Sequence, residues 1–139
     1  MANLSSSRPD FSGQTALAGI ASSTSANPDG GTIGLVFGEI AHLGKLNLRG
    51  QNNLAKAVKA VTGCTFPPKA NRFQSAGERH MVWLGPDEYL LLCEAGKEQE
   101  LQDSLNSMIP LTHFAITNVS DSLCALSLYG PAVRAVLAK

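Results

Sequence analysis

The stretch MVWLGPDEYLLL, residues 81–92, consists of two apolar runs separated by the polar turn Gly85–Glu88. Pro86 occupies the second position of this turn, where a type I turn favours proline. The stretch therefore predicts a β-hairpin. Neither run alternates polar with apolar residues, although successive side chains of a strand leave by opposite faces of the sheet. We expect both faces of the hairpin to be apolar.

One apolar face of this hairpin can pack against helices, and the other face needs a second cover. Two explanations stay open at this point. The second face belongs to the core of this chain, or it is buried against a partner protein, because aromatic residues are enriched at the centres of interfaces. The candidate interface residues are Trp83, Leu84, Tyr89 and Leu91.

Asp87 and Glu88 form an adjacent carboxylate pair between the two apolar runs. Paired carboxylates serve as acid and base when their surroundings separate their pKa values. Adjacent residues on a turn usually point in different directions, however, and the proline before them already explains the turn. The pair is therefore interpreted as the polar tip of the hairpin.

Outward from the hairpin, the apolar pattern changes between the two-residue period of strands and the 3.6-residue period of helices. Strands are predicted at residues 33–37, 45–49, 113–119 and 123–129, helices at 52–63, 97–108 and 131–139, and a loop at 64–73. The turn Ser120–Ser122 joins the last two strands into a second hairpin. This order predicts an α+β domain with a mostly antiparallel sheet and two to three helices on one face.

The N-terminal segment differs in composition from the rest of the chain. Residues 1–31 are rich in Ser, Ala, Asn, Pro and Gly and lack apolar periodicity, which predicts a flexible arm. The short apolar run Thr15–Ala21 matches a secretory signal poorly. Residues 32–139 are expected to form a single α+β domain, since a chain of 139 residues can bury a core without disulfides or metals.

Composition argues against several classes of partner. The 11 basic and 11 acidic residues give a formal net charge of zero, whereas nucleic acids and anionic membranes bind surfaces with excess Lys and Arg. No apolar run approaches the roughly 20 residues that cross a bilayer. Cys64, Cys93 and Cys124 form no CxxC pair, which favours free thiols in a reducing cytoplasm. Charged residues make up only 16%, which favours surface hidden in an assembly.

The remaining motifs predict no catalytic, cofactor-binding or metal-binding residue. Gly30–Gly34 precedes a strand, whereas phosphate-binding loops follow one. His42, His80 and His113 lie far apart, without a ligand partner at a suitable spacing. Ser120–Ser122 contains a potential nucleophile, but the GxSxG pattern is missing.

Four segments in chain order carry a recognisable pattern: KLNLRGQ (45–51), WLGPDEYLL (83–91), NVSDS (118–122) and LSLYGPAVRAVLAK (126–139). Together they resemble the gamma subunit of heterotetrameric sarcosine oxidase, with agreement from about residue 32 to the end. Members of that family resemble the folate-binding domain of glycine-cleavage aminomethyltransferases. The resemblance therefore implies part of that fold for this chain.

The resemblance also implies a function. The complex oxidises sarcosine to glycine with O2 and tetrahydrofolate, giving hydrogen peroxide and 5,10-methylenetetrahydrofolate. The gamma subunit is implied to be a noncatalytic structural subunit whose partners are the alpha, beta and delta subunits. FAD, FMN, NAD and tetrahydrofolate are implied for the whole complex, with none held by this chain.

Members of the family continue past the last predicted helix into a second α/β half, whereas this sequence ends at Lys139. A helix and a sheet edge without cover would favour pairing with another copy, so a homo-oligomer of the isolated chain is a further expectation. An alternative from another class is a free-standing folate-binding protein or an aminomethyltransferase-like enzyme.

Overall fold

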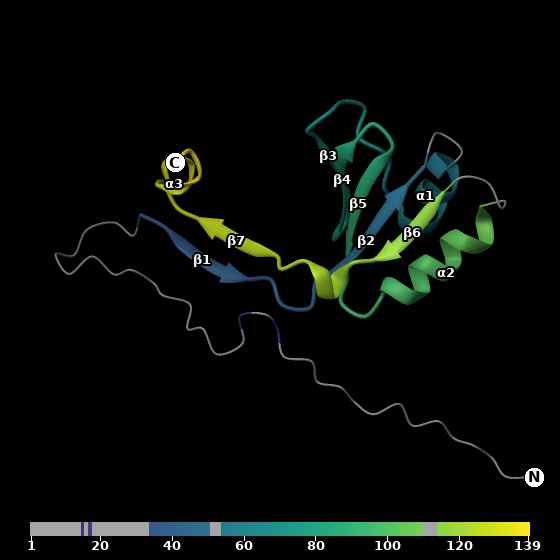
Figure 1. Ribbon diagram of the computed structural model, residues 1–139, viewed down its shortest axis with the longest axis horizontal. Helices are drawn as coiled ribbons and strands as arrows, with labels where there is room; N and C mark the ends of the chain where they lie inside the picture. The colour runs from purple at the N-terminus through teal and green to yellow at the C-terminus, as the bar shows by residue number, and fades with distance from the viewer. Residues whose placement is uncertain (1–14, 16, 18–33, 51–53, 110–113) are drawn as a thin grey trace, which may run out of the picture.

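The computed structural model describes residues 15, 17, 34–50, 54–109 and 114–139. Most of the predicted flexible arm, residues 1–31, lies outside the described residues. The elements, shown in Figure 1, are β1 (Val36–Glu39), β2 (Gly44–Arg49), α1 (Leu54–Thr62), β3 (Phe73–Ala76), β4 (Arg79–Gly85), β5 (Glu88–Cys93), α2 (Glu98–Met108), β6 (Ala115–Asn118), the 3-10 turn η1 (Ser120–Ser122), β7 (Leu126–Tyr129) and α3 (Val133–Leu137).

A five-stranded sheet in the order β3-β4-β5-β2-β6 forms the main body, and each of its pairings is antiparallel. In β2, which lies between β5 and β6, Leu46 and Leu48 are fully buried. Asn47 and Arg49 alternate with these leucines and point to the opposite face of the sheet. Figure 1 shows α1 and α2 on one side of this sheet and the β1–β7 pair with α3 on the other side. The predicted α+β class with an antiparallel sheet is confirmed.

The core lies between the five-stranded sheet and the helices α1 and α2. Apolar residues recur at helical spacing in both helices, so each helix presents one apolar stripe to the sheet. Each leucine that is fully buried contributes about 1.5–3 kcal/mol relative to an exposed one. The largest fully buried side chains are Leu46, Leu48, Leu54, Val58, Cys64, Met81, Leu91, Cys93 and Leu105.

The predicted hairpin is present as β4 and β5. Met81 lies opposite Leu91 and Trp83 opposite Tyr89, with an irregularity in the register after Trp83. Residues 86 and 87 form the turn between the strands. The prediction of both strands, which was based on the proline of the turn and on the two apolar runs, is therefore confirmed.

Strand β3 was not predicted, because residues 64–73 were assigned to a loop and the polar residues after them gave no strand signal. In the structure β3 pairs with β4, with Phe73 opposite Val82. Gly77 has a positive φ of 61° and lies in the tight turn that joins the two strands. Pairing with the apolar strand β4 stabilises β3 despite its weak intrinsic preference.

The predicted second hairpin is wrong. Strand β6 pairs with β2, with Ile116 opposite Leu48, whereas β7 pairs with β1 in a separate two-stranded sheet, with Leu128 opposite Phe37. The turn η1 between them redirects the chain from one sheet to the other. Within the described ranges, no helix is long and apolar enough to cross a membrane.

Candidate functional site

The four candidate interface residues of the hairpin do not lie on one surface. Leu91 is fully buried in the core. Tyr89 lies on the same face and stacks on Phe66, with ring centroids 4.0 Å apart and an interplanar angle of 20°. Trp83, opposite Tyr89, is half-buried on that face. Leu84 points to the other face of the sheet and is 47% exposed.

The face of the five-stranded sheet that points away from α1 and α2 carries an apolar patch over β3, β4 and β5, beside the polar Asn47 and Arg49 of β2. We call this surface the open face and define it by Phe73, Val82, Leu84, Leu90 and Leu92. Register places Phe73 beside Val82 and Val82 beside Leu90 on it. Phe73 is 65% exposed. Val82, Leu90 and Leu92 are half-buried. Sequence reasoning expected an apolar second face but missed Phe73, because it lies on the strand that was not predicted.

The turn carboxylates Asp87 and Glu88 have separate partners. Asp87 forms an exposed ion pair with Arg49 at 3.5 Å, while Glu88 accepts a hydrogen bond of 2.8 Å from the side-chain amide of Asn47. Gly50 donates a backbone hydrogen bond of 2.9 Å to the carbonyl of Asp87. Each carboxylate is therefore used in holding the hairpin turn against β2.

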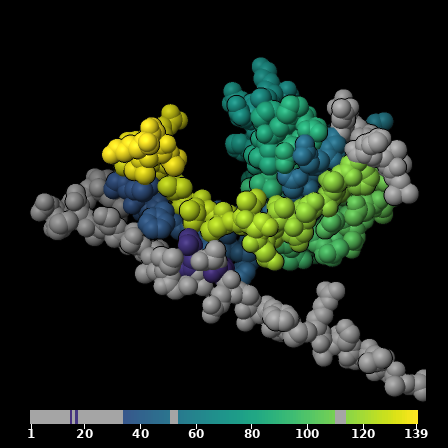
Figure 2. Space-filling model, in the orientation of Figure 1, coloured from purple at the N-terminus to yellow at the C-terminus, as the bar shows by residue number. Residues whose placement is uncertain are grey.

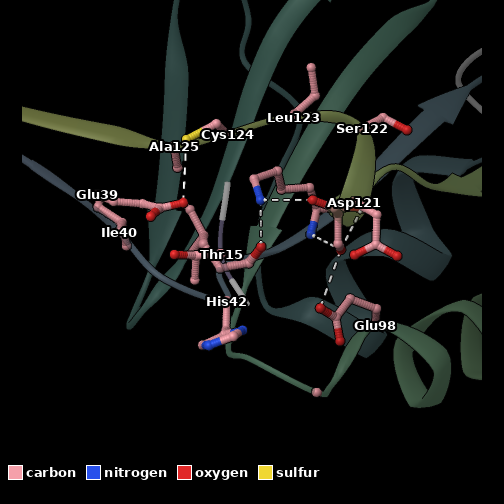
Figure 3. Close-up of a pocket in the computed structure, with 14 residues that line it drawn as sticks. Thr15, Glu39, Ile40, His42, Glu98, Asp121, Ser122, Leu123, Cys124 and Ala125 are labelled. Carbon is pink, nitrogen blue, oxygen red and sulfur yellow. Dashed lines mark hydrogen bonds between the residues drawn. The ribbon is translucent and has the colours of Figure 1, made fainter. Parts of the chain in front are cut away.

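A cavity of about 640 Å³ lies where the two sheets meet (Figure 3). Its most buried polar residue is Lys45, which is 6% exposed. The Lys45 ammonium donates to the backbone carbonyls of Leu43 at 2.8 Å and Ser120 at 3.3 Å. The Ser120 hydroxyl accepts from the backbone N–H of Lys45 at 2.9 Å and donates to Glu98 at 3.2 Å. These contacts fasten η1 to β2 and α2, which is a structural role.

Glu39 lies at the other side of this cavity, at the end of β1 (Figure 3). It accepts a hydrogen bond of 3.3 Å from the backbone N–H of Leu17 and a longer one of 3.5 Å from the Cys124 thiol. A hydrogen bond from Thr15 is the largest of the effects that lower the pKa of Glu39. Both described residues of the N-terminal segment therefore contact the end of β1.

The cysteines and histidines are held in separate places. Burial raises the pKa of Cys64 and raises that of Cys93 to about 11, so both thiols stay protonated at neutral pH. His80 shares a hydrogen bond of 2.8 Å with Ser75 on the sheet surface, and His42 lines the cavity at the sheet junction. His113 lies outside the described residues. Across the part of the chain that the structure describes, no group of three or more His, Cys, Asp or Glu could hold a metal ion.

Comparison with solved structures finds a chain of the heterotetrameric sarcosine oxidase from Corynebacterium sp. U-96, solved in complex with pyrrole 2-carboxylate. The two chains are 28% identical, with a TM-score of 0.65 over 73% of this chain. This chain spans about half of that relative, since the match covers 53% of the Corynebacterium chain. A comparison with curated proteins gives no significant match.

A family model described as the sarcosine oxidase gamma subunit family matches residues 49–139. The match begins at the end of β2 and includes both strands of the hairpin, η1, β7 and α3. Three of the four segments that resembled this family lie wholly inside it. Since it covers more than half of the 139 residues, the chain belongs to the sarcosine oxidase gamma subunit family.

Proposed function

We propose that this chain is a noncatalytic, structural subunit of a heterotetrameric sarcosine oxidase. The observation that carries the proposal is the match of residues 49–139 to the gamma subunit family. The complex would oxidise sarcosine to glycine with O2 and tetrahydrofolate, giving hydrogen peroxide and 5,10-methylenetetrahydrofolate. FAD, FMN, NAD and tetrahydrofolate belong to the complex under this proposal, and its partners are the alpha, beta and delta subunits in the cytoplasm.

The polar groups of the sheet junction and of the hairpin turn support a structural rather than a catalytic role. Lys45, Ser120 and Glu98 bind one another or the backbone, and Asp87 and Glu88 hold the hairpin turn. A general base or a nucleophile needs a free hydrogen-bond path to a substrate. These five side chains are instead used in joining elements of this chain.

Burial of apolar surface would drive the association. The open face supplies such surface, with Leu84 and Phe73 as its exposed members. Large apolar side chains gathered on one face of a small domain are typical of protein–protein contact sites. The interface proposal is therefore centred on the open face, and Tyr89 and Leu91 are assigned to the support behind it.

The direct test is copurification. A tagged form of this chain, expressed with the alpha, beta and delta subunits from the same source, is expected to retain all three through affinity and size-exclusion steps. The double variant Phe73→Ser with Leu84→Ser is expected to retain them at least tenfold less well, while Asp87→Asn, a change in an exposed ion pair, serves as the matched control. Equal retention by both variants would contradict the open face as the docking surface.

A titration with tetrahydrofolate separates this proposal from the free-standing folate-binding alternative. The isolated chain is expected to give no saturable signal by calorimetry at micromolar protein. Saturable binding of tetrahydrofolate at micromolar concentration would favour a folate-binding protein instead. If the chain fails to copurify with the partner subunits and also binds tetrahydrofolate, the free-standing folate-binding protein is the better explanation.

A further inference from the structure

A single carboxylate, that of Glu39 at the end of β1, binds both described residues of the N-terminal segment. The backbone N–H of Leu17 donates to its Oε2 atom at 3.3 Å, across 22 positions of sequence. The side chain of Thr15 donates a second hydrogen bond to the same group. Hydrogen bonds to an ionised carboxylate are about twice as strong as those between neutral groups. Two such donors from one segment fix both its place and its direction.

The rest of the chain holds Glu39 in position to receive these donors. Glu39 is the last residue of β1, which pairs with β7, and the backbone N–H of the next residue, Ile40, donates to the carbonyl of Ala125 at 2.8 Å. The Cys124 thiol donates to the Oε1 atom of Glu39 at 3.5 Å, which leaves Oε2 for Leu17. The acceptor is therefore positioned by β1 and by the residues before β7, independently of the N-terminal segment.

Apolar burial does not account for the position of this segment. Thr15 and Leu17 are half-buried. Among the described residues, the apolar side chains that form the core or pack against it do not include Leu17. Figure 2 shows this part of the segment, in purple, lying against β1, in blue, at the surface of the molecule. Within the described part of the chain, the hydrogen bonds to Glu39 are therefore the contacts that explain where the segment lies.

The surroundings of Glu39 favour the ionised form of its carboxyl group. The hydrogen bond from Thr15 is the largest effect that lowers its pKa, and those from Cys124 and Leu17 add to it. The coulombic effect of His42 also lowers this pKa, whereas desolvation raises it. The other charged residues that line the cavity, on β2, α2 and η1, are Lys45, Glu98 and Asp121. Glu39 is thus a charged acceptor at neutral pH.

We propose that the Glu39 carboxylate is a docking site for the chain's own N-terminal segment, which it recognises by the hydroxyl of Thr15 and the backbone N–H of Leu17. Both donors stabilise the ionised carboxylate more than the protonated one. Docking is therefore complete above the pKa of the undocked carboxyl and is lost as the pH falls through the lowered pKa of the docked state. Thr15 also lines the cavity at the sheet junction, so the docked segment forms part of the wall of that cavity. The inference does not depend on assembly into an oxidase.

The test measures the motion of the Leu17 amide by nitrogen-15 relaxation in the full 139-residue chain. An order parameter above about 0.6 is expected for the wild type, and a value below about 0.6 for Glu39→Ala, which removes both acceptor oxygens. Glu100→Ala removes an exposed carboxylate on α2, serves as the matched control and should leave the Leu17 order parameter unchanged. A wild-type value below about 0.6, or equal values in the wild type and Glu39→Ala, would overturn the proposal.

A second pair of variants covers the possibility that Glu39→Ala disturbs β1. Thr15→Val removes the hydroxyl with little change of size and is also expected to lower the Leu17 order parameter below about 0.6. Thr15→Ser keeps the hydroxyl and should retain the wild-type value. An order parameter that Thr15→Val leaves unchanged would overturn the proposal.

A pH titration of the Leu17 amide proton shift tests the same contact without a loss of structure. The shift is expected to follow Glu39, with a midpoint below the ordinary pKa of a glutamate, and this titration should be absent in Glu39→Gln. A Leu17 shift that stays constant with pH in the wild type would overturn the proposal. Ordering of Leu17 that is lost on dilution would identify the Glu39 of a second copy as the docking site and would also overturn it.

Discussion

Arg79 joins three elements of the main body through its guanidinium group. It contacts both carboxylate oxygens of Glu94, at 2.8 Å from Nε and 3.0 Å from Nη2, and donates to the carbonyl of Val61 at 3.3 Å. The hydrogen bond from Arg79 lowers the pKa of Glu94. Because the Glu94 side chain is 36% exposed, solvent screening limits the pair to about 1 kcal/mol.

Glu94→Gln is therefore expected to lower the free energy of unfolding by about 1 kcal/mol at pH 7. A carboxyl whose folded pKa is depressed contributes stability above its unfolded pKa, and this contribution is lost as pH falls through the folded pKa. Urea unfolding at pH 7 and below pH about 3 measures the difference between wild type and variant. A difference in unfolding free energy between wild type and Glu94→Gln that grows as the pH falls would contradict a stabilising ion pair between Arg79 and Glu94.

The three thiols are predicted to react in a fixed order. Cys124 is exposed, whereas Cys64 and Cys93 are buried, and burial raises the pKa of Cys93 to about 11. Iodoacetamide at pH 8 should label Cys124 first and the other two only when denaturant opens the core. Mass spectrometry of peptides over time measures the order, and early labelling of Cys93 would show that the helices do not cover β5.

At the scale of elements, local patterns were enough to predict some units and not others. The hairpin 81–92 was predicted correctly, because its turn chemistry and its apolar runs lie within one short stretch. Strand β3 was missed, since its residues are polar and its pairing with β4 stabilises it. The partners of β6 and β7 were missed for another reason: Ser120, which sets the direction of η1, bonds to Lys45, 75 residues away in the sequence.

The candidate interface was also predicted only in part from the sequence. Sequence reasoning expected an apolar second face on the hairpin, and Leu84 lies on that face. The sequence did not show that Leu84 is exposed and Leu91 is buried, because a strand without polar and apolar alternation does not reveal which side chains point to the helices. The exposed leucines of β7 were also missed, since a strand that was assigned to a hairpin was expected to be paired on that side.

Ser120→Ala is expected to lower the free energy of unfolding by about 1–3 kcal/mol, because the backbone N–H of Lys45 loses its acceptor in a part-buried place. Ser122→Ala, four positions before β7 and exposed, is the matched control and should change stability by less than about 0.5 kcal/mol. Thermal or urea unfolding of both variants checks this. Equal stability of the two variants would show that the bond to β2 does not direct η1.

The two faces of β4 should respond differently to truncation. Met81→Ala removes a fully buried side chain and is expected to cost about 2–5 kcal/mol of folding stability. Leu84→Ala acts on a side chain that is 47% exposed and should cost less than about 1 kcal/mol. Urea unfolding measures the loss of folding stability in both variants. A larger loss for Leu84→Ala than for Met81→Ala would place the open face in the core of this chain.

At the scale of the whole molecule, the apolar surface is unevenly distributed. Met81 and Leu91 form one compact core with α1 and α2, whereas exposed apolar side chains gather on the open face and around β7. We propose that partner subunits bury the first of these surfaces. Membership of the sarcosine oxidase gamma subunit family supplies the setting in which such surfaces would be buried.

An omission experiment on the complex tests whether this chain is a structural subunit. The alpha, beta and delta subunits are expressed with and without this chain, and the particle mass and the sarcosine-dependent release of hydrogen peroxide are measured on the same fractions. A four-chain particle with activity is expected when the chain is present, and loss of that particle when it is absent. A complex of unchanged stability and full activity without this chain would contradict the structural role proposed here.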